Sequence, residues 1–211
     1  THQVLLSPLL KKKEVFETFP VFSPDGNKLY FCAAKQMPIP EKYKEIRYSL
    51  CSIDFDKEKG TFGNRIDTLI DAEKMKKSIS FPRPSYDGKY IMFTLSDYGN
   101  FSIWHKEADL WLLNLQDGSL RTIHEVNSDN TESFHNWSSN SHWFVFSSRR
   151  EDGLYTRLYL ACINKEGKVS KPFLLPQKNP MNYYDKLLYS YNVPEFTNSP
   201  VKIEPRKLER E

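Results

Sequence analysis

Apolar residues in this chain occur in short runs, many of them aromatic or β-branched, and each run is bounded by turn-forming residues. Three of these runs, at residues 28–32, 89–93 and 142–146, directly follow an eight-residue frame. The frame reads FPVFSPDG at 19–26, FPRPSYDG at 81–88 and FHNWSSNS at 134–141. A repeat of about 50–60 residues built from short strands and turns is typical of β-propellers and other repeat arrays.

Within each repeat, the pattern predicts four strands joined by turns. The predicted strands are residues 17–23, 28–34, 47–55 and 65–71, then 78–85, 90–96, 109–115 and 120–125, then 132–138, 143–148, 157–163 and 171–175. The turns carry residues that favour turn geometry, because Pro presets φ, Asp bonds its own backbone and Gly accepts positive φ. These structural turn residues are Pro24, Asp25, Gly26, Asp87, Gly88, Asp117 and Gly118. Only residues 71–77 and 183–188 could form a short turn of helix.

Four short strands in each repeat predict an all-β fold, a β-propeller with about three four-stranded antiparallel blades. The expected division is a lead segment at 1–15, blades at 16–77, 78–131 and 132–180, a connector with one further strand at 181–200, and a charged tail at 201–211. A β-sandwich of consecutive hairpins would explain the strands, but it would not explain why the frame repeats.

A fourth copy of the frame begins at residues 193–200 and stops, so residues 189–197 are expected to form a lone first strand. Closed propellers have about four to eight blades, because fewer leave faces and edges of the sheets exposed. We therefore expect this chain to be the C-terminal part of a larger propeller of about six to eight blades. The missing N-terminal blades would come from the same gene or from another chain.

The segments at 20–31 and 109–118 resemble the repeat of TolB-type, WD-repeat-like β-propellers. The resemblance covers about residues 16–176, and the third copy departs from it at His135-Asn136 and Asn140-Ser141. Residues 98–110 and 147–157 resemble a secreted or periplasmic bacterial branch of that family. The resemblance implies a periplasmic or outer-membrane-associated protein.

Charge and cysteine content narrow the range of functions. The 30 basic residues exceed the 27 acidic ones by only three, so we expect no nucleic-acid partner. No apolar run is long enough to span a membrane. Cys32, Cys51 and Cys162 match no zinc pattern, and we expect neither a metal nor a cofactor. A Cys32–Cys51 bridge across a hairpin is possible, but reduced, buried thiols are favoured.

Propellers place ligands on the loops at one end of the ring, here residues 35–45, 97–108 and 149–156, with 71–77, 127–132 and 177–186. Aromatic and basic residues are candidates there, since they stack on ligands and bind anions. The candidate binding residues are Tyr98, Phe101, Trp104, His105, Arg149 and Arg150. The alternative reading, which the sequence favours, is that Trp104 and Phe101 cap the core of the blade, that His105 bonds a backbone carbonyl, and that the arginines form ion pairs between blades.

Catalytic motifs are missing from the sequence, which has no Gly-x-Ser-x-Gly elbow, Walker loop or His-Glu-x-x-His. The sequence therefore predicts a non-catalytic binding or assembly module for a protein or glycan partner in the bacterial cell envelope. One alternative is a subdomain of an enzyme, either a hydrolase gate or a glycan-active protein, with catalytic groups partly outside this chain. Another is a structural fragment whose open edges pair with a second copy.

Overall fold

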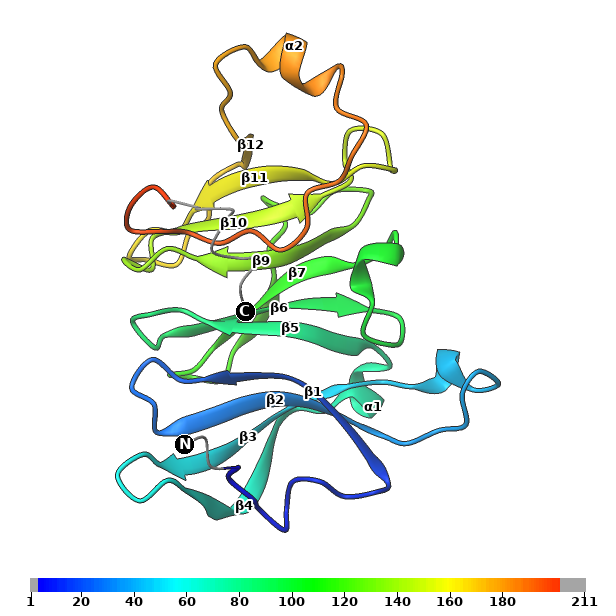
Figure 1. Cartoon of the computed structure of the whole chain (residues 1–211), viewed down its shortest axis with the longest axis vertical. Coiled ribbons are helices and arrows are strands. Elements are labelled where there is room, and N and C mark those ends of the chain that lie inside the picture. The colour runs from blue at the N-terminus through cyan, green and yellow to red at the C-terminus, as the bar shows by residue number, and fades with distance from the viewer. Residues whose placement is uncertain (1–3, 202–211) are drawn as a thin grey trace, which may run out of the picture.

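The computed structural model describes residues 4–201, which form three four-stranded antiparallel sheets stacked face to face (Figure 1). The first sheet contains β1 (Val15–Phe22), β2 (Lys28–Lys35), β3 (Ser49–Asp56) and β4 (Thr61–Ile70). The second contains β5 (Ser78–Pro84), β6 (Tyr90–Ser96), β7 (Asp109–Asn114) and β8 (Leu120–Thr122). The third contains β9 (Glu132–Trp137), β10 (Trp143–Ser148), β11 (Arg157–Cys162) and β12 (Phe173–Leu174). In each sheet the strands lie in chain order, which confirms the predicted arrangement of partial-propeller blades.

Helices are short and lie in the connections. They are η1 (Tyr43–Glu45), α1 (Ala72–Met75), η2 (Ser102–Trp104) and α2 (Pro180–Tyr184). The side chain of Asp71 caps α1 by accepting hydrogen bonds from the backbone N–H groups of Glu73 and Lys74. The predicted helical turn at 71–77 is confirmed, whereas the one predicted at 183–188 begins earlier, at Pro180.

Apolar residues fill the spaces between the sheets. The layer between the first two sheets consists mainly of Tyr30, Cys32, Ile46, Tyr48, Leu50, Ile79, Ile91, Phe93 and Leu95. The layer between the second and third sheets consists mainly of Met92, Leu110, Leu112, Trp137, Phe144, Phe146 and Tyr159. Because side chains alternate along a strand, Met92 and Phe93 of β6 enter different layers. Burial on both faces explains why this strand reads as one continuous apolar run.

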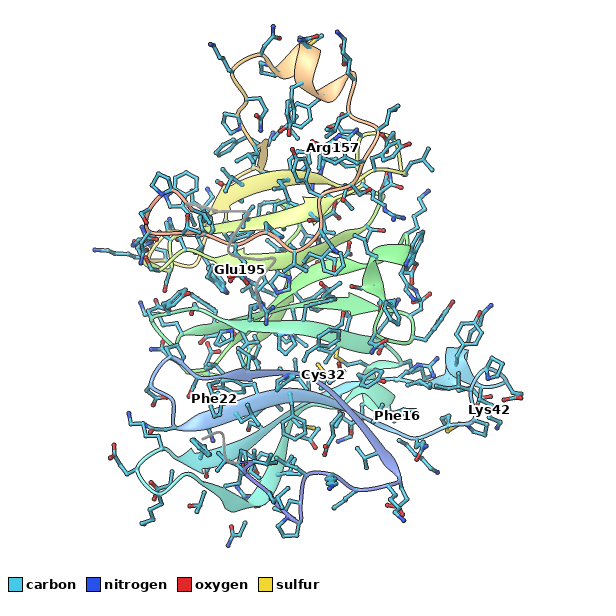
Figure 2. All side chains as sticks on the ribbon, in the orientation of Figure 1. Phe16, Phe22, Cys32, Lys42, Arg157 and Glu195 are labelled. Atoms are coloured by element: carbon cyan, nitrogen blue, oxygen red, sulfur yellow. The ribbon has the colours of Figure 1, made fainter. Side chains whose placement is uncertain are left out.

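The same alternation determines on which face of the first sheet Cys32 and Cys51 lie. In the ladder of β2 and β3, Cys32 is opposite Leu50 and Cys51 is opposite Phe31. Cys32 therefore lies in the layer between the first two sheets (Figure 2), while Cys51 lies on the opposite face of the first sheet. All three cysteines are free; Cys32 and Cys51 are buried, as expected, and Cys162 is half-buried. Burial raises the pKa of both the Cys32 and the Cys51 thiol.

The repeated Phe of the frame has a backbone role that the pattern did not reveal. Phe19, Phe81 and Phe134 have φ values of 53°, 52° and 49°, in the left-handed region that bulky residues rarely adopt. Each lies where the register of the first strand of its sheet shifts against the second strand. The ring centroids lie 4.2 Å apart for Phe19 and Phe81, and 4.8 Å apart for Phe81 and Phe134. The frame thus specifies a β-bulge and a column of aromatic rings across the three sheets.

Two predicted elements are corrected by the structure. Residues 189–197 form no strand, because no strand in the described part of the chain pairs with them. β8 ends at Thr122 rather than at residue 125, since the carbonyl of Ile123 accepts hydrogen bonds from the N–H groups of Val126 and Asn127 and closes a turn.

The segment that follows α2 nevertheless docks like the first strand of another blade. The N–H of Ile79 in β5 donates to the carbonyl of Tyr48 at 2.9 Å, and that of Glu132 in β9 donates to Ala108 at 2.8 Å. The corresponding bond here runs from the N–H of Tyr191 to the carbonyl of Thr156, at 3.2 Å. The side chain of Arg157, which Figure 2 labels, adds a hydrogen bond to the carbonyl of Leu187 at 3.1 Å. The inter-blade contact therefore recurs without a regular strand.

The lead segment predicted at 1–15 lies partly outside the described residues, as does nearly all of the charged tail predicted at 201–211. Residues 4–201 include no helix of the length and hydropathy needed to cross a membrane.

Candidate functional site

The connections with η1, α1 and η2 lie at one end of the stacked sheets, on the right in Figure 1, and the tight hairpin turns lie at the other end. The loop predicted at 177–186, which contains α2, lies instead beyond the third sheet, at the top of the view. Between the β2–β3 loop and the β6–β7 loop is a cavity of about 530 Å³. It is lined by Ile39, Pro40, Tyr43, Ile46, Tyr48, Tyr98, Gly99, Asn100, Phe101, Trp104 and His105. Four of the six candidate binding residues therefore lie together, beside aromatic residues of the first blade that the sequence analysis did not single out.

The two loops are joined through Gly99. Its N–H donates to the carbonyl of Ile46 at 2.8 Å, and its own carbonyl accepts a hydrogen bond from the hydroxyl of Ser78 at 2.6 Å. Gly99 has a φ of 67°, which glycine adopts without the steric cost that a Cβ would bring. This glycine fixes one wall of the cavity against the first blade.

Aromatic rings form the inner wall of the cavity and its rim. Tyr98 meets Tyr43 edge to face at 5.6 Å between centroids, and it meets His105 in the same way at 4.5 Å. Phe101 and Trp104 are 73% and 74% exposed. They therefore do not cap the core of the blade, as the alternative reading of the sequence had it. A cavity of this size lined by apolar rings, with large aromatic side chains exposed at its rim, is typical of binding sites.

His105 is held in place from two sides. Its Nδ1 lies 2.9 Å from Oε1 of Glu107, and its backbone carbonyl accepts a hydrogen bond from the hydroxyl of Thr131 at 2.7 Å. The imidazole partner is thus a carboxylate and not the backbone carbonyl of the alternative reading. Because Nδ1 is engaged in this way, the imidazole provides mainly a packing surface in the wall of the cavity, where it makes a T-shaped contact with Tyr98.

The two adjacent arginines point to different places. The guanidinium of Arg149 lies 4.8 Å from the ring centroid of Trp104, so it extends the rim of the cavity. The guanidinium of Arg150 instead turns inward, where it donates to the carbonyl of Val126 at 2.6 Å and to Glu132 at 3.0 Å. It also lies over the ring of Tyr159 at 4.4 Å. Arg150 therefore belongs to a buried network and does not line the cavity.

A carboxylate that the sequence analysis did not identify lies near this end, at the start of β7. Burial raises the pKa of Asp109 to about 6, and the negative charge of Glu132 adds to the effect. Lys77 and His124 act in the opposite direction. No local sequence signal marks this residue, because Glu132 comes from the next blade. Within residues 4–201, no three His, Cys, Asp or Glu side chains gather closely enough to hold a metal ion.

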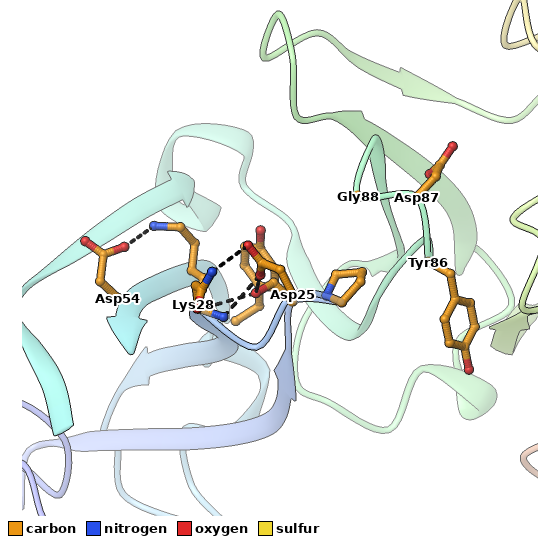
Figure 3. A pocket seen from close by; sticks show the side chains of 10 residues that line it. Asp25, Lys28, Asp54, Tyr86, Asp87 and Gly88 are labelled. Carbon is orange, nitrogen blue, oxygen red and sulfur yellow. Dashed lines mark hydrogen bonds and ion pairs between the residues drawn. The ribbon is translucent and has the colours of Figure 1, made fainter. Parts of the chain in front are cut away.

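A second cavity, of about 590 Å³, lies among the hairpin turns at the other end (Figure 3). Its walls include the turn residues Asp25 and Asp87, predicted to be structural. The carboxylate of Asp25 accepts hydrogen bonds from the hydroxyl of Ser23 at 2.5 Å and the N–H of Asn27 at 3.1 Å, and the Ser23 bond in particular lowers its pKa. Lys28 pairs with Asp54 in the same wall. The polar groups here already bond one another, so this cavity is a weaker candidate.

Comparisons with known proteins support the fold. No family model and no curated protein matches the chain. A solved structure of a putative TolB from Agrobacterium tumefaciens matches 77% of this chain and 50% of its own, with 20% identity and a TM-score of 0.50. An oligogalacturonate lyase in complex with manganese matches 79% of this chain and 44% of its own, with 13% identity and a TM-score of 0.55. A puromycin-hydrolyzing peptidase of Mycobacterium tuberculosis matches 78% of this chain and 24% of its own, with 16% identity and a TM-score of 0.50.

These likenesses support a TolB-like β-propeller fold, and this chain spans half or less of each of the three proteins. Their names include a TolB and two enzymes, so the fold is compatible with both a binding protein and a catalyst.

Proposed function

We propose that this chain is a non-catalytic binding module that holds a protein partner at the cavity between its first and second blades. The observation that carries the proposal is the exposure of Phe101 and Trp104, each about three-quarters exposed, at the rim of an apolar cavity. Large aromatic side chains lose contact with water when a partner covers them, and they are frequent among the residues that dominate binding energy.

The lining favours a protein side chain over a sugar. Sugars present many hydroxyl groups, each of which needs a hydrogen-bond partner when it is buried. Nδ1 of His105 is already bonded to Glu107 and is not available to a sugar hydroxyl. The side chains of Ile39, Pro40 and Ile46 offer no hydrogen bonds. An aromatic or large aliphatic side chain of a partner would fill such a cavity with little loss of hydrogen bonding.

The location of the protein is part of the same proposal. The TolB-like repeat favours the periplasm or the outer membrane of a bacterium, where a partner would also lie. Fractionation of cells that express the full gene tests this directly, and recovery of the protein only in the cytosol would contradict it.

Selection from a displayed library of random peptides tests the site. We expect the selected peptides to share an aromatic or large aliphatic residue. We also expect their affinity to fall at least about tenfold for Trp104→Ala, because a buried aromatic contact is lost. Tyr86→Ala is the matched control, because Tyr86 is an exposed aromatic residue, 57% exposed, in the wall of the other cavity.

Three results would overturn the proposal: equal loss of affinity for Trp104→Ala and Tyr86→Ala, no loss for either variant, or selected peptides without large apolar residues. A glycan array distinguishes the remaining partner class. Binding to an oligosaccharide that depends on Trp104, with no peptide selected, would replace the protein partner by a glycan.

One observation favours a second candidate, a propeller subdomain of an enzyme. Asp109 has a pKa raised to about 6, and carboxylates with raised pKa values are frequent in catalytic sites. Hydrolase and lyase assays on the full gene product, with peptide and pectin-type substrates, would test it. Activity lost in Asp109→Asn and kept in the exposed turn variant Asp117→Asn would support an enzyme. Unchanged activity in Asp109→Asn would exclude Asp109 from catalysis.

A further inference from the structure

We propose that Arg149 makes this site selective for a carboxylate next to a large apolar group, so that the ligand is an acidic peptide segment. This inference rests on the proposed function, because it assigns the charge of the partner bound at the same cavity. Trp104 links Arg149 to the cavity, because it lines the cavity and its ring centroid lies 4.8 Å from the guanidinium of Arg149.

Arg149 is chemically unusual among its neighbours because its charge is not paired. Within the described residues, its guanidinium makes no hydrogen bond or ion pair, and its Nε is buried without a partner. Arg150 next to it bonds Glu132, and Arg157 bonds the carbonyl of Leu187. Partial burial lowers the pKa of Arg149, yet an arginine stays charged in proteins. The unpaired charge of its guanidinium, beside the exposed Trp104 at the rim, favours an incoming anion.

The nearest acidic residue does not meet this need. The negative charge of Asp152 acts on Arg149 from a distance, but no ion pair forms between them in the described part of the chain. The carboxylate of Asp152 instead accepts hydrogen bonds from the N–H groups of Leu154 at 2.7 Å and Tyr155 at 2.8 Å. It is therefore held in its own turn and leaves the guanidinium to a ligand.

The geometry favours a carboxylate as that ligand group. A guanidinium is planar and offers a fork of N–H donors that matches the two oxygens of a carboxylate. The cation–π contact with the indole of Trp104 restricts the guanidinium, so less conformational freedom is lost when the anion binds. An apolar side chain in the cavity would bring an adjacent carboxylate of the same peptide, from Asp, Glu or a C-terminus, to Arg149.

Two probes that differ only in charge test this inference. N-acetyl-phenylalanine carries the ring and a carboxylate, and N-acetyl-phenylalaninamide carries the ring and a neutral amide. Each is titrated against the whole chain at about 0.15 M salt, a condition that screens distant charges. The indole N–H resonance of Trp104, assigned with Trp104→Phe, reports binding and gives the dissociation constant.

For the unaltered protein, we expect the acid to bind about tenfold more tightly than the amide. In Arg149→Gln this preference should disappear, while the affinity for the amide is kept, which also shows that the cavity is still folded. Lys106→Gln is the matched control, because Lys106 is an exposed cation of the loop that carries Trp104, and this variant should retain the preference.

The outcomes separate the inference from the proposed function. Equal affinity of the two probes for the unaltered protein, or equal loss of the preference in Arg149→Gln and Lys106→Gln, would overturn the role of Arg149 and leave the cavity as an apolar site. If neither probe shifted the Trp104 resonance at any concentration, both the inference and the proposed function would be wrong.

Discussion

His135 makes the stability of this fold sensitive to acid. Its imidazole is 1% exposed, in the interface between the second and third blades. Its Nε2 donates a hydrogen bond to the carbonyl of Met92 at 2.9 Å, and its Nδ1 is buried and has no partner in residues 4–201. A second proton would have to be placed on Nδ1, inside an apolar layer. Burial therefore lowers the pKa of His135 to about 3.

The size of the effect follows from the two pKa values. An unfolded histidine takes up its proton below about pH 6.5, whereas the folded one stays neutral down to about pH 3, so the unfolded state binds more protons between these values. The stability that the neutral side chain provides is complete above about pH 6.5 and is lost as the pH falls towards 3. From about pH 7.5 to about pH 4.5, this one residue should remove about 2.5 kcal/mol from the free energy of unfolding.

Urea unfolding followed by tryptophan fluorescence, at several pH values, measures this contribution. The comparison is between the unaltered chain and His135→Gln, whose amide keeps a donor for the Met92 carbonyl but does not titrate. The variant should lose about 2.5 kcal/mol less than the unaltered chain between the same two pH values. His142→Gln serves as the control, because it replaces in the same way an exposed histidine that directly precedes β10 of the same sheet.

The pH dependence has to be compared as a difference between variants, since Asp109 titrates in the same range with the opposite sign. If the unaltered chain and His135→Gln lost stability in parallel as the pH fell, the buried neutral imidazole would not be the cause. The same conclusion would follow if His142→Gln changed the slope as much as His135→Gln.

The remaining predictions use the same unfolding assay. Because the pKa of Asp109 is raised to about 6, its stabilising contribution is complete below about pH 4 and is lost as the pH rises through 6. Asp109→Asn should therefore add about 1 kcal/mol at neutral pH, after allowance for the screening of a half-exposed group, and nothing near pH 4; a loss of stability at neutral pH would contradict this. At the left-handed position of Phe81, Phe81→Gly should be about 1 kcal/mol more stable than Phe81→Ala, although glycine usually destabilises strands; the usual order would show that the bulge is not strained. Removing one partner of the buried Glu132–Arg150 pair, as in Glu132→Ala, should cost about 3–5 kcal/mol. Asp54→Ala, which breaks an exposed pair, should cost clearly less, and similar losses would count against the buried network.

The local pattern of apolar runs and turn-forming residues was sufficient to predict most of the strands. The strands predicted at 90–96 and 143–148 coincide with β6 and β10, because these central strands are buried on both faces and are bounded by strong turn signals. The outer strands differ more, since their pattern is weaker: β4 begins at Thr61 rather than at residue 65, whereas β8 and β12 are shorter than predicted. A neighbouring turn shortens β8. The sequence placed Cys32 and Cys51 on paired strands but left a bridge between them open, and the register of those strands decides against it.

The site was only partly predictable. Aromatic residues in the loop at 97–108 were recognised by their type, but Tyr43 and Ile39 join them only because the first blade packs against the second. Nothing in the pair Arg149-Arg150 shows that one guanidinium lies on Trp104 and the other on a buried glutamate. The raised pKa of Asp109 likewise depends on a charge from the next blade. These properties come from contacts between repeats, which the pattern within one repeat does not contain.

In the proposed function, the cavity between the first two blades binds an apolar group of a partner. The most direct test is a map of backbone amide chemical shifts during titration with N-acetyl-phenylalaninamide. We expect saturable shifts at Gly99, Asn100 and Phe101, and none at Gly88 in the wall of the other cavity. Shifts centred on Gly88, or no saturable shift around Gly99, would contradict the claim.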